Sequence, residues 1–221
     1  MRRFYGIFLL LLIVFSIYSC SIERELARDF IDKSKNMPVL LLSTDNVIFT
    51  NEKLKKISGF DSLSVKKQDS LWSVNTVFLD SIDDVKLISI IFNKFKSNLE
   101  SYCFKVFTKE NKKDFDNINQ EKYIINLAQF EVSEDIYTHR DEEYFFDSIL
   151  YYQDVDLNIV GINFWIELSD LKENNPKILF KDYYISDKLN SRFVLDEISY
   201  NVNYRYKITP LKLSDIYTYA N

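Results

Sequence analysis

The stretch DDVKLISIIFNKFKSNLESYCFKVF, residues 83–107, decides the fold class. Its first part carries apolar side chains at helical spacing, and these are Val85, Ile88, Ile91, Phe92, Phe95 and Leu99. This pattern predicts an amphipathic helix over 83–101 with one apolar face. The aromatic stretch Tyr102–Thr108 predicts a strand, in which Cys103 is expected to be a small buried hydrophobe. An apolar helix face needs a sheet to cover it, and this strand is expected to belong to that sheet.

The other strands are predicted on both sides of this stretch. Val39–Leu42 is a short apolar run between Pro38 and a polar segment, which is typical of a strand buried on both faces. Further apolar or alternating patterns predict strands over 47–49, 122–132, 154–168, 177–185 and 199–208. The alternation changes phase at Val160-Gly161, which predicts a β-bulge or a bend there.

The remaining segments complete the predicted domain. Residues 65–79 are expected to form a second helix, and a short helix is expected after Pro210, whereas the polar segment 51–64 is expected to be a loop. Helices and strands that are segregated along the chain favour an α+β fold, with helices on one face of a mixed or mostly antiparallel sheet. The length predicts a single domain, over 37–221.

The N-terminus has the organisation of a cleaved export signal. Arg2 and Arg3 precede an apolar run over 4–17, and Ser19 places a small side chain directly before Cys20. A membrane-spanning helix needs roughly 20 apolar residues, whereas the apolar core of a secretory signal has about 7–15. We therefore expect a signal peptide over 1–19 and a short helical spacer over 20–36. An uncleaved anchor, or a plain signal peptide with a chance cysteine, is the alternative.

Ile17-Tyr18-Ser19-Cys20 resembles the lipobox of bacterial lipoproteins, although Tyr18 is bulky for its position. The resemblance implies that Cys20 becomes the first mature residue and carries acyl chains such as palmitate, which would anchor the protein in the cell envelope, at the outer membrane. Two further segments resemble uncharacterised Bacteroidota lipoproteins: residues 25–30 and 123–129. The order of elements is similar to that in the curli secretion lipoprotein and in peptidoglycan synthase activators. These resemblances imply a location, on either the periplasmic or the surface side, and no reaction.

Composition argues against several functions. The net charge of -5 disfavours nucleic acid, whose phosphates attract basic surfaces. The chain has one histidine, His139, and no paired cysteines, so a zinc site of thiolates or several histidines is not expected. Nucleophile-elbow, Walker and dinucleotide motifs are absent from the sequence. We therefore predict no catalytic residue, no metal and no cofactor.

An acidic segment raises two further possibilities. Its acidic residues and its histidine are Glu131, Glu134, Asp135, His139, Asp141, Glu142, Glu143 and Asp147. They could supply oxygen ligands to calcium or paired carboxylates to a glycosidase, but the segment lacks the turn that makes calcium ligands converge. A solvated acidic loop with His139 on its surface is the favoured interpretation.

Aromatic residues within and beside this segment are the remaining candidates. Tyrosine brings an apolar ring and a polar hydroxyl to an interface, although aromatic residues also favour strands for packing reasons alone. The candidate contact residues are Tyr137, Tyr144, Phe145, Tyr151 and Tyr152. The leading hypothesis is a non-catalytic, lipid-anchored envelope module that contacts another protein through its sheet face or this segment. A glycan-binding module is the alternative, and a hydrolase comes third.

Overall fold

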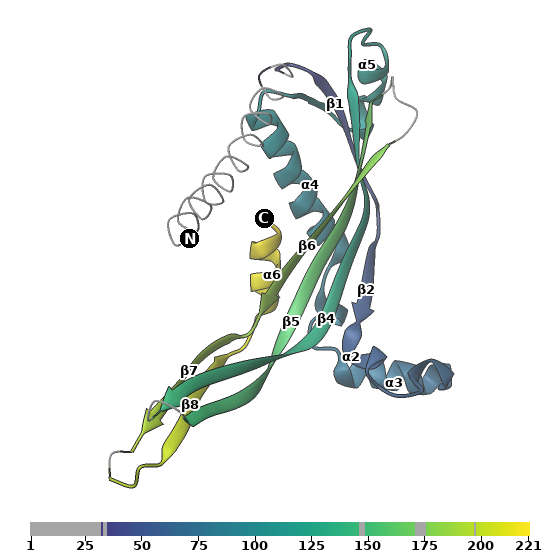
Figure 1. Cartoon of the computed structure of the whole chain (residues 1–221). Coiled ribbons are helices and arrows are strands. Elements are labelled where there is room, and N and C mark those ends of the chain that lie inside the picture. Colours follow the sequence, from purple (N-terminus) through teal and green to yellow (C-terminus); the bar gives the residue numbers. More distant parts are fainter. Residues whose placement is uncertain (1–31, 33–34, 146–148, 171–175, 197) are drawn as a thin grey trace, which may run out of the picture.

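The computed structural model describes residues 32, 35–145, 149–170, 176–196 and 198–221 (Figure 1). They form an α+β fold around a six-stranded mixed sheet whose main path is β3-β1-β4-β5-β6, with β2 beside β4. The strands are β1 (Pro38–Ser43), β2 (Val47–Asn51), β3 (Lys105–Phe107), β4 (Tyr123–Phe145), β5 (Ile149–Asp170) and β6 (Lys177–Ser186). The N-terminal parallel pairings and the antiparallel β4–β5 and β5–β6 pairings confirm the predicted fold class.

Strand β1 is buried on both faces, as its uninterrupted apolar run predicted. Leu41 belongs to the main core, which contains α4 (Asp84–Ser101) and α6 (Leu213–Ala220). Leu40 points the other way and packs with Phe107 and with Phe115 of α5 (Lys112–Asp116), the two rings lying 5.7 Å apart. Helix α5 therefore forms a small second core on the face of the sheet opposite to α4 and α6.

The predicted amphipathic helix is confirmed as α4. The Asp83 side chain accepts a hydrogen bond of 2.9 Å from the Lys86 backbone N–H at its start, which satisfies a free donor of the first turn. Leu87 and Ile91 are buried against the sheet. The hydroxyl oxygen of Tyr217 in α6 accepts a hydrogen bond of 2.8 Å from the backbone N–H of Asp83, and this bond joins the two helices.

The prediction that Cys103 is buried in a strand directly after this helix is wrong. The residue is exposed and has φ +66°, so it lies in the left-handed region rather than in a buried strand. Its backbone N–H donates to Glu100 O at 2.9 Å, and that of Phe104 donates to Leu99 O at 3.1 Å. This is the Schellman arrangement that closes a helix, usually with glycine at the left-handed position. Strand β3 consequently begins only at Lys105.

The segment between β2 and α4 is more structured than the sequence indicated. The expected loop over 51–64 contains α2 (Glu52–Lys55) and the short 3-10 helix η1 (Phe60–Ser62). The helix expected over 65–79 ends earlier, as α3 (Val65–Asn75), and η2 (Leu79–Ser81) follows it. A further 3-10 helix, η3 (Lys109–Asn111), leads into α5. The helix α3 projects from the base of the molecule (Figure 1).

Strands β4 and β5 form one long hairpin, and this overturns the predicted acidic loop. Their pairing runs from Tyr123 opposite Asp170 to Phe145 opposite Ile149, with a register shift between Leu127 and Gln129. The acidic residues from Glu131 to Glu143 therefore lie on the two faces of a strand, whereas Asp147 lies outside the described residues. The high charge of the segment concealed this pairing, because a charged side chain can point into solvent from a well-paired backbone.

The bulge predicted at Val160-Gly161 is also wrong. Gly161 lies opposite Ser133 in regular register. A Cβ atom at Gly161 would lie 2.6 Å from the Ser133 Oγ atom and 3.0 Å from the ring of Tyr184. The glycine therefore lets the side chains of Ser133 and Tyr184 lie close to the sheet, and the strand register is regular where the apolar pattern changes phase.

A separate hairpin packs beside the far end of β4–β5. It consists of β7 (Lys188–Leu195), which the sequence did not predict, and β8 (Val202–Thr209), which replaces the strand expected over 199–208. We use the name "arm" for residues 135–145 and 149–158 together with β7 and β8. The arm extends away from α4 and α6, at the lower left of Figure 1.

Candidate functional site

The arm brings the predicted aromatic residues together but divides them between its two faces. Side chains alternate along paired strands, so within the arm the odd-numbered residues of β4 and β5 point toward β7–β8 and the even-numbered residues point outward. Tyr137, Phe145 and Tyr151 lie on the inner face, and Tyr144 and Tyr152 on the outer face. The five candidates therefore form two groups with different surroundings.

The inner face is a packing surface between the two hairpins. The ring of Phe145 lies 5.7 Å from that of Tyr151 and 6.4 Å from that of Phe193 in β7, in edge-to-face contacts. Phe193 continues the contact to Tyr204 of β8 at 4.9 Å. Aromatic pairs of this kind stabilise a fold by about 0.5–1.5 kcal/mol beyond their area burial. Phe145 and Tyr151 therefore hold the arm together.

A polar cluster joins the same two hairpins. The Asp141 carboxylate accepts hydrogen bonds from the hydroxyls of Ser191 and Tyr204, and it lies 3.0 Å from His139 Nε2. The bonds from Ser191 and then Tyr204 hold the pKa of Asp141 below its ordinary value. Burial, followed by the bond to Asp141, raises the pKa of the Tyr204 hydroxyl.

This cluster has the residue types of a hydrolase without the required connections. A nucleophilic serine must hydrogen-bond to the histidine that removes its proton. Here Ser191 bonds to Asp141, and Asp141 also takes the contact with His139. His139 lies in a paired strand beside a polar pocket of about 520 Å³, and not in the predicted charged loop. The bonds from Ser191 and Tyr204 to Asp141 connect the two hairpins, and we call them the clasp.

The outer face presents apolar side chains to solvent. Tyr144 is 68% exposed, Tyr152 is 61% exposed and Leu150 is 40% exposed. Tyr144 lies directly opposite Leu150, and Tyr152, opposite Glu142, belongs to the next pair on the same face of the hairpin. These three residues form what we call the outer patch.

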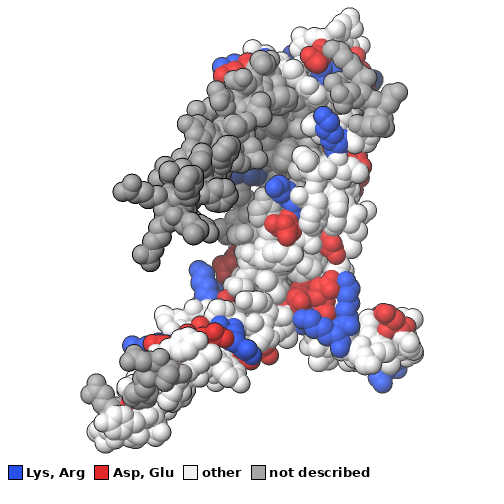
Figure 2. All heavy atoms as spheres, viewed as in Figure 1, with Lys and Arg blue, Asp and Glu red and all other residues white. Residues whose placement is uncertain are grey.

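Arg140 lies beside the outer patch, opposite Asp154 in the next residue pair on the same face. Its guanidinium group donates two hydrogen bonds to Asp154, of 2.7 and 2.8 Å, and lies 4.8 Å from the ring centre of Tyr152. The hydrogen bonds between the two groups, together with their opposite charges, lower the pKa of Asp154 and raise that of Arg140. A bidentate pair has fixed geometry, so it positions the guanidinium under the tyrosine. In Figure 2, acidic and basic side chains are mixed along the visible face of the arm.

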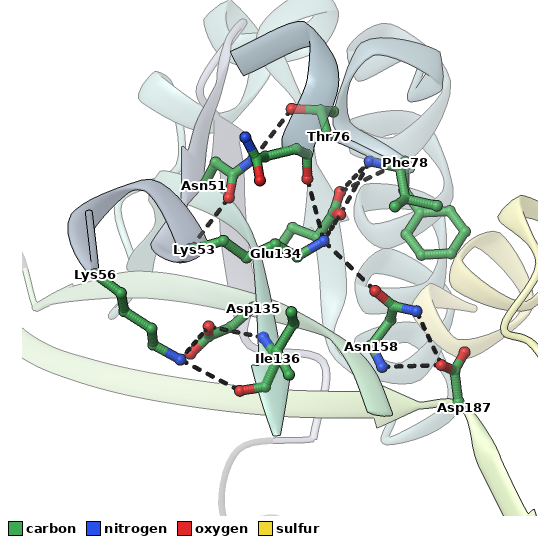
Figure 3. Close-up of polar contacts among 12 residues, drawn as sticks. Asn51, Lys53, Lys56, Thr76, Phe78, Glu134, Asp135, Ile136, Asn158 and Asp187 are labelled. Carbon is green, nitrogen blue, oxygen red and sulfur yellow. Dashed lines mark hydrogen bonds and ion pairs between the residues drawn. The ribbon is translucent and has the colours of Figure 1, made fainter. Parts of the chain in front are cut away.

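The arm leaves the body of the molecule at a buried polar junction (Figure 3). Glu134 is completely buried and forms an ion pair with Lys53 of α2. Its carboxylate also accepts hydrogen bonds from the backbone N–H groups of Val77, at 2.9 and 3.1 Å, and Phe78, at 3.0 Å. The prediction of a solvated loop is therefore wrong for Glu134, which fixes the segment after α3 to β4.

Asn158 links this junction to the second hairpin. Its side-chain oxygen lies 3.5 Å from Lys53 Nζ, and its backbone and side-chain N–H groups donate to Asp187 at 2.9 and 3.0 Å. Asp187 also accepts a bond of 2.7 Å from the Leu211 backbone N–H, just before α6. Local sequence patterns contain no signal for Lys53 or Asp187, because their partners lie far away along the chain.

Other predicted features can be placed only in part. Cys20, the signal peptide over 1–19 and nearly all of the spacer over 20–36 fall outside the described residues. In the part of the chain that is described, no three histidine, cysteine or acidic side chains lie close enough to hold a metal ion together. None of the helices described there has the length and apolar character needed to cross a membrane.

No protein-family model matches the sequence, and no curated protein is significantly similar to it.

Proposed function

We propose that this protein is a non-catalytic, lipid-anchored envelope protein whose arm binds another protein through the outer patch. The observation that carries the proposal is the exposure of Tyr144, Leu150 and Tyr152 together on one face. Tyrosine and arginine are enriched at the centres of protein interfaces, because they combine apolar contact area with hydrogen bonding.

The surroundings of the outer patch support a binding role. The inner face of the same hairpin is already occupied by β7–β8, whereas Tyr144 and Tyr152 remain largely exposed. The hairpin is anchored at its base by the Glu134 junction, and the Arg140–Asp154 pair braces its surface. A surface that is ordered before binding loses less conformational entropy when a partner docks.

The membrane part of the proposal rests on Cys20. Acylation there would tether the domain, and each buried methylene contributes about 0.8 kcal/mol to membrane binding, so two or three chains would anchor it stably. Placement at the outer membrane, with the domain on the periplasmic or the surface side, completes the proposal.

A pull-down with paired variants tests the protein contact. The full chain carrying Tyr144→Ala and Tyr152→Ala should lose a partner that the wild type retains from envelope extracts, because the variant removes both exposed rings. Tyr102→Ala is the matched control, since Tyr102 is a similarly exposed tyrosine at the end of α4. Retention of the same partner by the double variant, at wild-type yield, would rule out the outer patch.

Glycan binding remains the second candidate for the same surface. Tyr144 and Tyr152 lie on one face of adjacent strands, where exposed rings could stack on sugar rings. Retarded migration in a gel containing envelope polysaccharide, lost in the double variant and kept in Tyr102→Ala, would favour this candidate over a protein partner.

A further inference from the structure

A second hollow lies on the body of the molecule, away from the arm. It is a groove of about 590 Å³ bordered by α4, the middle of β5, β6 and α6. Binding sites for small molecules have volumes of about 300–1,000 Å³ and are mostly apolar, so the groove has a suitable size for such a ligand. It shares no residue with the outer patch.

The wall of the groove is apolar and continuous with the core. Ile91, Ile162 and Ile166 are less than a tenth exposed and belong to the main hydrophobic cluster. Phe164 stacks on Tyr183 at 5.7 Å, and Tyr183 meets Tyr219 of α6 edge-to-face at 6.3 Å. An alkyl chain lying along this wall would exchange water for contact with apolar side chains, and the exchange is favourable for each methylene buried.

The charged side chains in the lining are of one sign. Lys94 of α4 and Lys181 of β6 both border the groove, and no aspartate or glutamate side chain does so. Both lysines are exposed, and neither forms an ion pair with another residue in the described ranges. Two cations from different elements beside an apolar wall, in a chain of net charge -5, complement a ligand with an anionic end.

We propose that this groove binds a single-chain anionic amphiphile of the fatty-acid class. The alkyl chain lies along Ile162, Phe164 and Ile166, and the carboxylate is held by Lys94 and Lys181. Lysine suits this position, because its aliphatic stem can cover apolar surface while its ammonium group contacts an anion. This binding activity is separate from the protein contact proposed for the arm.

Photo-crosslinking of the full chain in cells tests the proposal. A diazirine-bearing hexadecanoate is supplied, the cells are irradiated, and labelled peptides are identified by mass spectrometry. We expect labels that depend on irradiation within residues 91–98 and 162–166. Excess dodecanoate should compete for them, whereas dodecyltrimethylammonium, with an equal chain and a cationic head, should not. Acylation of Cys20 is distinguished by its position and by its independence of irradiation.

Lysine variants provide the matched comparison. Lys94→Met with Lys181→Met removes the charges but keeps unbranched side chains, and the labelling of the groove should fall about tenfold, equivalent to about 1.4 kcal/mol. Lys66→Met with Lys67→Met, on the exposed surface of α3, should leave it unchanged. Unchanged melting temperatures would show that both variants fold.

Four outcomes would overturn the proposal: no label in the groove, equal labelling of the two double variants, equal competition by the cationic amphiphile, or adducts with the mass of a glycerophospholipid. The last result would identify membrane lipid as the source of the chain, in place of a free single-chain acid.

Discussion

Glu134 is the residue on which the junction between body and arm depends. Its buried carboxylate is compensated by the Lys53 ammonium group and by two backbone N–H donors. Removal of one partner from a buried ion pair leaves an uncompensated charge and typically costs about 3–5 kcal/mol. Lys53→Met should therefore lower the free energy of unfolding by several times more than Lys56→Met.

Lys56 is a close control for this comparison. It lies three residues from Lys53 and pairs with Asp135, the neighbour of Glu134, but the Lys56 side chain is 60% exposed and that of Lys53 only 10%. An exposed pair contributes about 0–1 kcal/mol. Urea denaturation of the two variants measures the difference, and equal losses of stability would show that Glu134 is not held as described.

Cys103 offers a prediction of the opposite sign. Its left-handed conformation costs an L-amino acid roughly 1–2 kcal/mol, whereas glycine adopts it freely at some cost in chain entropy. Cys103→Gly should therefore raise the free energy of unfolding by about 0.5–1 kcal/mol. Cys103→Ala removes the thiol but keeps the Cβ atom, so it should not stabilise the protein. Thermal melts of both variants test this, and equal stabilisation would assign the effect to loss of the thiol.

Residues of this kind mark the limit of prediction from sequence. Alternation of apolar and polar residues indicates which side chains share a face of the sheet, but not which other segments pack against that face. Gly161 is required by the close passage of Ser133 and Tyr184, and Glu134 is buried by α2 and the segment after α3. These neighbours are remote in the sequence, so local patterns carry no trace of them.

At the scale of elements, the two hairpins of the arm are joined through Asp141. Its pKa is lowered in the folded protein by bonds from Ser191 and Tyr204, so the ionised form stabilises the contact. A carboxyl group has a pKa of about 3.9 in the unfolded chain. When folding lowers this pKa, the ionised carboxylate stabilises the fold fully at any pH above about 3.9. This stabilisation is lost as the pH falls through the lower pKa of the folded state. Below pH of about 4, β7–β8 should therefore loosen from β4–β5.

Hydrogen exchange of the backbone amides in β7 and β8 measures this loosening. In Asp141→Asn the added dependence on acid should disappear, because the side chain no longer titrates. Asp154→Asn is the control, since the pKa of Asp154 is also lowered but its carboxylate bonds to Arg140 on the outer face. If Asp154→Asn abolished the dependence and Asp141→Asn did not, the clasp would be misassigned.

Elements with strong periodicity could be predicted, and elements stabilised by pairing could not. The helix α4 and the buried strand β1 were identified because their apolar patterns match one type of structure. The charged half of the β4–β5 hairpin and the polar strand β7 lack such a pattern. They are held by backbone pairing and by aromatic contacts between hairpins, which become visible only when distant segments are brought together.

At the scale of the whole molecule, the body and the arm have separate tasks in our proposal. The body holds the apolar groove, the arm carries the outer patch, and an acyl anchor on Cys20 would hold both at a membrane. The sequence singled out Tyr144 and Tyr152 together with three other aromatic residues, but only the structure separates these two from the packing residues Phe145 and Tyr151.

The anchor makes a prediction of its own. The wild-type chain should incorporate a fatty-acid label without irradiation and should partition with membranes, whereas Cys20→Ser should do neither. Cys103→Ser, which alters the other cysteine, should behave as the wild type. Label that persists in Cys20→Ser would contradict lipidation at this residue.

The most direct test of the central claim places a photo-crosslinking amino acid at single positions of the full chain in living cells. Positions 144 and 152 should each give one discrete adduct with a partner protein, the same from both positions. Position 102, similarly exposed at the C-terminal end of α4, should not give it. Absence of a shared adduct from 144 and 152, or the same adduct from 102, would contradict the account that the outer patch of the arm is the contact surface.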